Sequence, residues 1–297
     1  MDTVQVKTIL QKNKSTEWFG TEYNMNLYRG CNHGCIYCDS RSDCYHVDNF
    51  EQVRAKEDCL RILRDELRCK IRSGIIGTGA MSDPYNQYEK DEQLTCHALE
   101  LIDAYEFGVM SLTKSALIER DTDIYCSIAE HSPVLCQVTV TTADDGLSEM
   151  IEPNVSKSSE RFEALAKMSE RGVFTGIVMT PILPFVEDNE DNILKILRMA
   201  KECGVRSVYA MFGLTIRSGQ REYFYKNLDK IFPDSRLSKK YANTYGNRYV
   251  CSSPDAHKLW NVYTKECERL GLIYNMREII AAYKLGYGDR QLSFFYE

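Results

Sequence analysis

The chain has 297 residues, of which 43% are hydrophobic, and its 37 Lys and Arg against 43 Asp and Glu give a net charge of −6. This composition excludes a disordered or collagen-like chain, and the length suits one large domain with an appendage. No apolar run is long enough to cross a membrane and the first residues lack the apolar core of a signal peptide, so we expect a cytoplasmic protein with no membrane partner.

The first predicted elements are an extended leader over residues 1–22 and a strand over residues 24–29. A cysteine-rich loop follows this strand directly. Barrel enzymes place their chemistry at the C-terminal ends of their strands, so we expect the loop to lie at that end of a sheet.

Strands and helices then alternate along the chain. A β-branched run marks the strand at residues 134–142, and Gly172 and Gly204 follow two helices in the manner of C-terminal caps. The further strands are predicted at residues 74–79, 108–112, 134–142, 173–180 and 205–212, and the helices at residues 50–72, 91–105, 118–129, 159–171 and 189–203.

Six strands that alternate with helices predict an α/β fold with a parallel sheet. A closed eight-unit barrel needs about 250 residues, whereas the alternation here ends after six units. Two architectures remain, a partial (β/α)6 TIM-type barrel that is open on one side and a doubly wound sheet. The glycine-rich turn G-x-G-x-x-G of the doubly wound sheet is absent, since Gly77-Thr78-Gly79 is only a fragment of it.

Residues 226–297 depart from the alternation and form a C-terminal extension, which we expect to be a lid or flank on the open side. Helices are predicted at residues 222–231, 254–270 and 279–285, with an irregular segment at 232–253. The extension holds 12 Lys and Arg against 8 Asp and Glu, and basic residues interspersed with tyrosines can serve nucleic acid. We favour the alternative that its tyrosines anchor a small packed subdomain; these are Tyr241, Tyr245, Tyr249, Tyr263, Tyr274, Tyr283, Tyr287 and Tyr296.

The loop after the first strand holds Cys31, Cys35 and Cys38 in the spacing C-x3-C-x2-C. Thiolates are soft ligands that suit iron–sulfur chemistry, and three of them leave one iron of a four-iron cluster open for another ligand. A structural zinc site usually shows a second cysteine pair, which is missing here. Disulfide frameworks belong to small secreted chains, so the 12 cysteines are expected to be reduced, some of them as ligands.

The run Tyr-Arg-Gly-Cys-Asn-His-Gly-Cys-Ile-Tyr-Cys, with Tyr37 before the last cysteine, resembles the spore photoproduct lyase-like branch of the radical S-adenosylmethionine (SAM) superfamily. The resemblance implies a partial barrel over residues 23–225 and a [4Fe-4S] cluster on the three cysteines. It also implies S-adenosyl-L-methionine on the open iron, cleaved to a 5′-deoxyadenosyl radical that takes a hydrogen atom from a substrate. An electron donor such as flavodoxin or ferredoxin is then needed. The cofactor carries this chemistry, while the protein binds and orients the cofactor and the substrate and excludes side reactions.

The same resemblance assigns the cofactor contacts. Tyr37 would pack near the adenine, and Gly77-Thr78-Gly79 would hold the methionyl amino group, because glycines let a backbone approach a ligand. A lysine at a strand end suits the methionyl carboxylate. The residues assigned to the cofactor are Tyr37, Gly77, Thr78, Gly79, Ser82, Asp83, Lys114 and, on the fourth strand, Thr139 or Thr141.

Two positions depart from the lyase. Ala80 stands where the lyase has its hydrogen-donating cysteine, and Asp39 stands where it has a tyrosine after the third cluster cysteine. We therefore expect the radical chemistry without photoproduct repair, and take Cys44, as a substitute thiol, and Asp39 as candidate catalytic positions. Polar residues near strand ends are substrate-contact candidates: Arg41, Asp43, Tyr85, Glu152 and Arg217.

The sequence leaves the substrate open among a small molecule, a peptide and a nucleic acid. The alternatives are a nucleic-acid modification or repair enzyme of the lyase type, a non-catalytic zinc-binding protein, and an ordinary methyltransferase. The last of these would not need the cysteine triplet.

Overall fold

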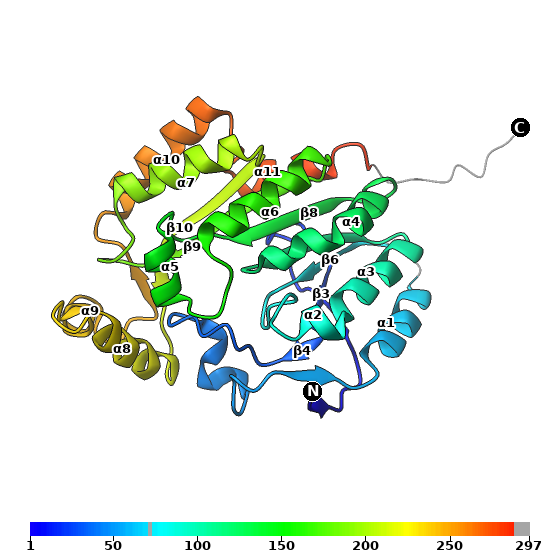
Figure 1. The fold of residues 1–297 in the computed structure, drawn as a ribbon, viewed down its shortest axis with the longest axis horizontal. Coiled ribbons are helices and arrows are strands. Elements are labelled where there is room, and N and C mark those ends of the chain that lie inside the picture. The colour runs from blue at the N-terminus through cyan, green and yellow to red at the C-terminus, as the bar shows by residue number, and fades with distance from the viewer. Residues whose placement is uncertain (71–72, 288–297) are drawn as a thin grey trace, which may run out of the picture.

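The computed structural model describes residues 1–70 and 73–287 and is built around an eight-stranded sheet (Figure 1). Six of its strands are parallel and lie side by side in chain order, namely β3 (Tyr23–Met25), β6 (Ile75–Thr78), β7 (Gly108–Thr113), β8 (Val134–Thr139), β9 (Thr175–Ile182) and β10 (Ser207–Thr215). Antiparallel strands flank them at the two edges, β2 (Leu10–Lys12) and β11 (Val250–Ser252). The sequential order and the unpaired edges confirm the partial barrel and exclude the doubly wound sheet.

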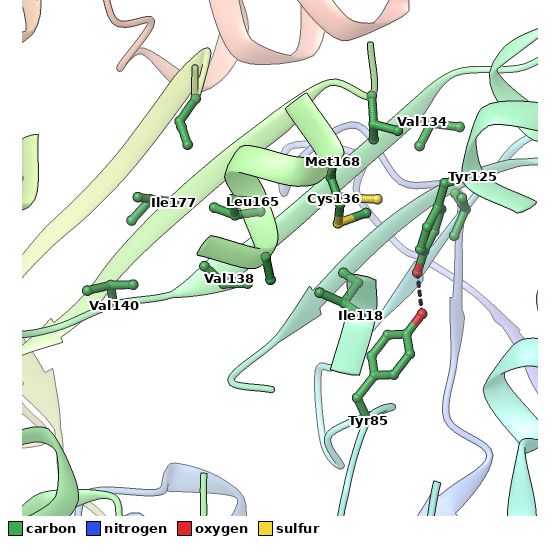
Figure 2. Packing of buried hydrophobic residues seen from close by; sticks show 14 of the residues in the cluster. Tyr85, Ile118, Tyr125, Val134, Cys136, Val138, Val140, Leu165, Met168 and Ile177 are labelled. Atoms are coloured by element: carbon green, nitrogen blue, oxygen red, sulfur yellow. Dashed lines mark hydrogen bonds between the residues drawn. The ribbon is translucent and has the colours of Figure 1, made fainter. Parts of the chain in front are cut away.

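Helices cover the outer face of the sheet, as Figure 1 shows for α3, α4, α6 and α7. Strand residues Val138 and Ile177 lie beside Leu165 and Met168 of α6, and all four are buried (Figure 2). The helices between the parallel strands are α1 (Cys59–Arg68), α2 (Glu89–Glu92), α3 (Leu94–Ala104), α4 (Thr122–Ala129), α5 (Asp145–Ile151), α6 (Ser158–Glu170) and α7 (Glu190–Glu202).

Two predictions near the cysteine loop were wrong in part. The strand expected at residues 24–29 leaves the large sheet after Met25, and β4 (Tyr28–Arg29) joins a separate three-stranded sheet. The helix expected at residues 50–72 begins only at Cys59, because β5 (Arg54–Lys56) pairs with β4 and with β1 (Thr3–Val4). The cysteine loop therefore lies between β4 and β5 and does not follow a strand of the barrel.

The inner face of the sheet is closed at one end by the leader and the last helix. Successive side chains of a strand point to opposite faces, and the inward set includes Met110 and Val178. They pack with Phe19 of the leader and with Ile279 and Tyr283 of α11 (Met276–Lys284). The Tyr283 hydroxyl donates a 2.5 Å hydrogen bond to the Phe19 carbonyl, which ties α11 to the leader.

The C-terminal extension is more ordered than predicted. The segment at residues 232–253 was expected to be irregular, but it contains helix α9 (Leu237–Tyr245) and strand β11. Helix α8 (Gln220–Ile231) packs against α9, and α10 (Ala256–Leu270) lies along α7 (Figure 1). The packing role of the tyrosines is confirmed for four that are buried, while Tyr296 lies outside the described residues: Tyr241, Tyr245, Tyr263 and Tyr283.

No helix within the described ranges has the length and apolarity needed to cross a membrane. All 12 cysteines are free thiols. The division into units at residues 22/23 and 225/226 stays a prediction.

Candidate cluster and cofactor site

The cysteine loop is fixed by backbone hydrogen bonds at both of its ends. The Cys31 N–H donates to the Phe50 carbonyl at 2.8 Å, and the Ile36 N–H donates to the Ile151 carbonyl at 3.0 Å. Gly30, at φ +83°, allows the first contact, because a Cβ there would lie 2.6 Å from the Phe50 oxygen. The three cysteines are therefore presented by a defined backbone.

The C-terminal extension supports this loop from behind. Ile36 and Tyr37 are buried in an apolar cluster with Phe224 of α8 and Tyr241 of α9. Cys35 lies in the same cluster. This packing shields one side of the loop from water, so the extension contributes directly to the site.

The other side of the loop faces a cavity of about 430 Å³, which we call the cofactor cavity because most of the predicted cofactor residues line it. Residues that follow β6 and β7 line it together with the ends of β9 and β10, so it opens at the C-terminal edge of the sheet, as expected. It brings together all three cysteines and six other predicted site residues, which are Tyr37, Asp39, Gly79, Ser82, Asp83 and Lys114.

The three cysteines fit a cluster better than a single ion. A tetrahedral zinc with Zn–S bonds of about 2.3 Å would hold its sulfurs about 3.8 Å apart. Within the described residues, one set brings three His, Cys, Asp or Glu ligand atoms within 4.8 Å of one another, and it is Cys96, His97 and Glu100 on α3. Cys31, Cys35 and Cys38 do not form such a set, so at least two of their sulfurs lie more than 4.8 Å apart, a spacing that suits a multi-iron cluster better than one zinc ion.

Burial raises the pKa of the Cys31 and Cys35 thiols. The pKa of Cys31 rises to about 12, chiefly through desolvation and then through the Asp83 carboxylate. The pKa of Cys35 rises well above its usual value, again chiefly through desolvation, although Lys114 opposes the rise. A thiolate is the ligand form, so binding of a cationic metal centre would supply the compensating charge.

Asp83 holds the loop after β6 against the end of β7. Its carboxylate accepts hydrogen bonds from the Thr113 hydroxyl at 2.5 Å, and from the N–H groups of Lys114 and Tyr85 at 2.9 Å each. His33 of the cysteine loop places Nδ1 3.4 Å from the same carboxylate, and burial lowers the pKa of His33. One carboxylate thus positions three segments around the cavity.

The ammonium group of Lys114 is the free cation of this cavity. It forms no ion pair with any described residue, and it lies 5.7 Å from the ring centroid of Tyr37. Asp83 bonds to the backbone N–H of Lys114, which leaves the ammonium available to an anionic ligand.

Behind Tyr37 lies a buried ion pair. The Tyr37 hydroxyl donates to Glu152, and Glu152 pairs with Arg161 of α6 at 2.5 Å. Arg161 also donates to the Thr139 carbonyl at 2.7 Å. Burial raises the pKa of Glu152 and Arg161 opposes the rise. Glu152 and Thr139 therefore lie outside the cavity walls, and Glu152 acts on the site by holding Tyr37.

Arg161 was missed by the sequence analysis. The available signal was its spacing, because Arg161 stands four and seven residues before Leu165 and Met168, on the apolar face of α6. A charged residue in that stripe requires a buried partner.

The motif Gly77-Thr78-Gly79 at the end of β6 contributes residues to two different cavities. Gly79, at φ +85°, lines the cofactor cavity, and a Cβ there would collide with the Leu112 carbonyl. Gly77 and Thr78 line a neighbouring cavity of about 260 Å³ instead. Ser82 faces the cofactor cavity but donates its hydroxyl to the Gly30 carbonyl at 2.7 Å, so it also anchors the cysteine loop.

Arg217 contacts two predicted residues, of which Asp39 lines the cavity, whereas Cys44 and Arg217 do not. It lies 3.2 Å from the Cys44 sulfur and 3.6 Å from the Asp39 carboxylate. It also donates to the hydroxyls of Tyr45 at 3.1 Å and Tyr249 at 2.7 Å. The candidates Cys44 and Asp39 thus both lie beside Arg217.

The remaining substrate candidates are not brought to the cavity. Arg41 stacks over the Tyr223 ring at 3.8 Å, and Asp43 accepts a hydrogen bond from Ser218 at 3.0 Å. Tyr85 lies in the core, where its hydroxyl is 2.9 Å from that of Tyr125 (Figure 2). Thr141 is buried, and its hydroxyl donates a hydrogen bond to the Glu187 carboxylate.

Solved structures of two other proteins share the fold of this chain. Spore photoproduct lyase complexed with dinucleoside spore photoproduct superimposes with a TM-score of 0.67 at 16% identity, over 92% of this chain and 80% of the lyase. A radical S-adenosylmethionine methyltransferase from Kitasatospora setae, with tryptophan substrate and a SAM analogue bound, gives a TM-score of 0.54 at 11% identity, over 83% and 51% of the two chains.

Sequence relatives are spread over distant organisms. An uncharacterized protein of Mycobacterium tuberculosis (strain ATCC 25618 / H37Rv) is 26% identical over 249 residues, 82% of this chain and 72% of the relative. An uncharacterized protein of Methanocaldococcus jannaschii is 32% identical over 174 residues, 58% of this chain and 64% of the relative. The model of the Radical SAM superfamily matches residues 25–200. The resemblance seen in the cysteine motif is therefore confirmed, and the chain belongs to the radical SAM superfamily.

Proposed function

We propose that this radical SAM enzyme binds a [4Fe-4S] cluster through Cys31, Cys35 and Cys38 and abstracts a hydrogen atom from its substrate. When bound, the cluster and S-adenosylmethionine would supply the electron and the 5′-deoxyadenosyl group for that chemistry. The observation that carries the proposal is the single cavity in which the three cysteines meet Gly79 and the unpaired Lys114.

The chain's own residues bind and orient the cofactor in this proposal. The ammonium of Lys114 attracts a carboxylate, and the bare backbone at Gly79 permits close approach of a ligand. Tyr37, held by Glu152, forms a fixed aromatic wall beside them. The apolar cluster behind the cysteine loop keeps water from that side.

The proposal also requires an electron donor such as flavodoxin or ferredoxin, and a reducing compartment. Free thiols at all 12 cysteines are compatible with the cytoplasm. The acidic net charge of −6 gives no general attraction for polyanions.

The fold of spore photoproduct lyase keeps a nucleic-acid substrate as the second candidate, because that enzyme has been solved with a dinucleoside photoproduct. Ala80 lines the cofactor cavity and has no abstractable hydrogen comparable to that of a thiol. We therefore assign the radical chemistry to this chain and not photoproduct repair.

Anaerobic reconstitution with iron and sulfide tests the proposal. About four irons per chain are expected, together with dithionite-dependent release of 5′-deoxyadenosine from S-adenosylmethionine. Cys31→Ala, Cys35→Ala and Cys38→Ala should each abolish the release. Cys69→Ala is the matched control, since Cys69 is exposed and lies outside the loop. One zinc without iron, or S-adenosylhomocysteine as the sole product, would overturn the proposal in favour of a zinc protein or an ordinary methyltransferase.

A further inference from the structure

A second cavity of about 260 Å³ adjoins the cofactor cavity. It is lined by residues of the leader and of β3, β6 and β7. Trp18 and Ala80 line both cavities, so the two spaces meet at these side chains. Any role of the second cavity beside the cofactor rests on the proposed function, because that function places S-adenosylmethionine in the first.

Trp18 offers an open aromatic surface at the junction. Its side chain is 45% exposed although it lies at the mouth of the barrel interior. The ring makes edge-to-face contacts with Phe19, at a centroid distance of 4.9 Å, and with Tyr209, at 5.3 Å. Phe19 is itself buried and anchored by Tyr283. The indole is thus held by its neighbours while part of its surface stays uncovered.

Two polar groups of the second cavity have no partner among the described residues. The Thr78 hydroxyl is buried, with the residue only 3% exposed, and makes no hydrogen bond. A buried hydroxyl left unpaired is destabilising, and a ligand that bonds to it would offset that cost. Lys14 also lines the cavity and forms no ion pair there. Lys14 is exposed, so its ammonium group is available to a ligand.

We propose that the second cavity is the substrate compartment and that it takes a planar conjugated ring bearing an anionic group. The ring would stack on Trp18, as flat rings do on aromatic side chains. Lys14 would attract the anionic group and would repel a cation from the indole. The Thr78 hydroxyl would bond to a polar atom of the ring or its substituent.

The size of the compartment narrows the substrate further. Pockets for drug-sized ligands hold about 300–1,000 Å³, and this one lies just below that range. It therefore takes a small molecule, or a single ring of a larger one. The junction at Ala80 places that ring next to the cofactor cavity, where a hydrogen atom has to be removed.

Binding of simple probes to the reconstituted enzyme, in the presence of S-adenosylmethionine, tests the assignment. The probes are benzoate, its non-planar analogue cyclohexanecarboxylate and its uncharged analogue benzamide, titrated calorimetrically. Benzoate should bind at least fivefold more tightly than either analogue. Trp18→Leu should remove the preference over cyclohexanecarboxylate, and Trp18→Phe should keep it. Lys14→Ala should remove the preference over benzamide, and Lys14→Arg should keep it.

Trp260→Leu is the control, since Trp260 is exposed on α10 and lines neither cavity. Iron content and the spectral response to S-adenosylmethionine are measured on the same samples. A wild-type protein that holds no iron and gives no spectral response to S-adenosylmethionine would refute the proposed function itself. Normal values with no benzoate preference, or with the same preference in Trp18→Leu, would overturn the substrate assignment alone. If Trp18→Leu does not fold, Lys14→Ala and Trp18→Phe decide the outcome.

Discussion

Arg161 and Glu152 form an ion pair that is almost fully shielded from solvent, with the two side chains 0% and 1% exposed. The pair joins α6 to the segment after α5, and through the Tyr37 hydroxyl it reaches the cysteine loop. It therefore links the packing of the barrel wall to the orientation of the cofactor site.

Arg161→Met should destabilise the protein strongly, because it leaves the Glu152 carboxylate buried without a counter-charge. Breaking such a pair costs about 3–5 kcal/mol, measured here as the free energy of unfolding in urea. Lys167→Met on the same helix is the control, because Lys167 pairs with Glu119 and Glu163 at the surface. Exposed pairs contribute about 0–1 kcal/mol. Equal losses in the two variants would show that the buried pair has no special role.

Lys114→Ala should weaken binding of S-adenosylmethionine and leave the cluster in place. A hydrogen bond to a charged group contributes about 1.5–3 kcal/mol, which corresponds to a roughly ten- to hundredfold change in Kd. The Kd is read from the spectral change of the reduced protein. Lys201→Ala, on the exposed side of α7, should leave it unchanged. An unaltered Kd in Lys114→Ala would remove this lysine from the cofactor site.

The contribution of Glu187 to the stability of the protein should fall as the pH rises from about 5 to about 8. The pKa of the buried Glu187 is raised from 4.5 to about 8, chiefly by desolvation and less by the nearby Glu152, against hydrogen bonds from Thr141 and Leu183. Between these values the native state keeps a proton that the unfolded chain has released, so each pH unit costs at most about 1.4 kcal/mol. Glu187→Gln should flatten the curve over this window, measured by urea unfolding at several pH values. Wild-type and Glu187→Gln curves with the same slope over this window would contradict the assignment.

The protein should not repair spore photoproduct, although it shares the fold of the lyase. A repair cycle ends with a hydrogen atom returned to the product radical, and the methyl group of Ala80 is a poor donor compared with a thiol. Incubation of the reconstituted enzyme with the photoproduct should yield no restored thymine. Restoration that disappears in Cys44→Ala would show that the thiol beside Arg217 replaces the missing donor.

Much of the barrel could be predicted from local pattern, because β6 to β10 are largely apolar and each is followed by a helix. The β-branched run at residues 134–142 and the glycines that end α6 and α7 carried this signal. Strand β5 could not be found in this way. Arg54–Lys56 is short and polar, and it becomes a strand only by pairing with β1 and β4, which lie far away in sequence.

Helix α9 was missed for a different reason. Its polar composition hid a spacing of four residues between the buried Leu237, Tyr241 and Tyr245, which is the period of one helix face. The cysteines and Lys114, which the motif singled out, line one cavity, while their roles stay a prediction. The Glu152–Arg161 pair depends on how separate segments pack together. The same holds for the placing of Gly79 and Thr78 in different cavities, and no single segment encodes either feature.

The most direct test of a three-cysteine cluster that binds S-adenosylmethionine is electron paramagnetic resonance of the anaerobically reconstituted, dithionite-reduced protein, with and without the cofactor. We expect a reduced four-iron signal whose shape changes when S-adenosylmethionine is added, in the wild-type protein and in Cys69→Ala. The signal should be absent in Cys31→Ala, Cys35→Ala and Cys38→Ala. A normal signal in all three of these variants, or a wild-type signal that ignores the cofactor, would contradict the account.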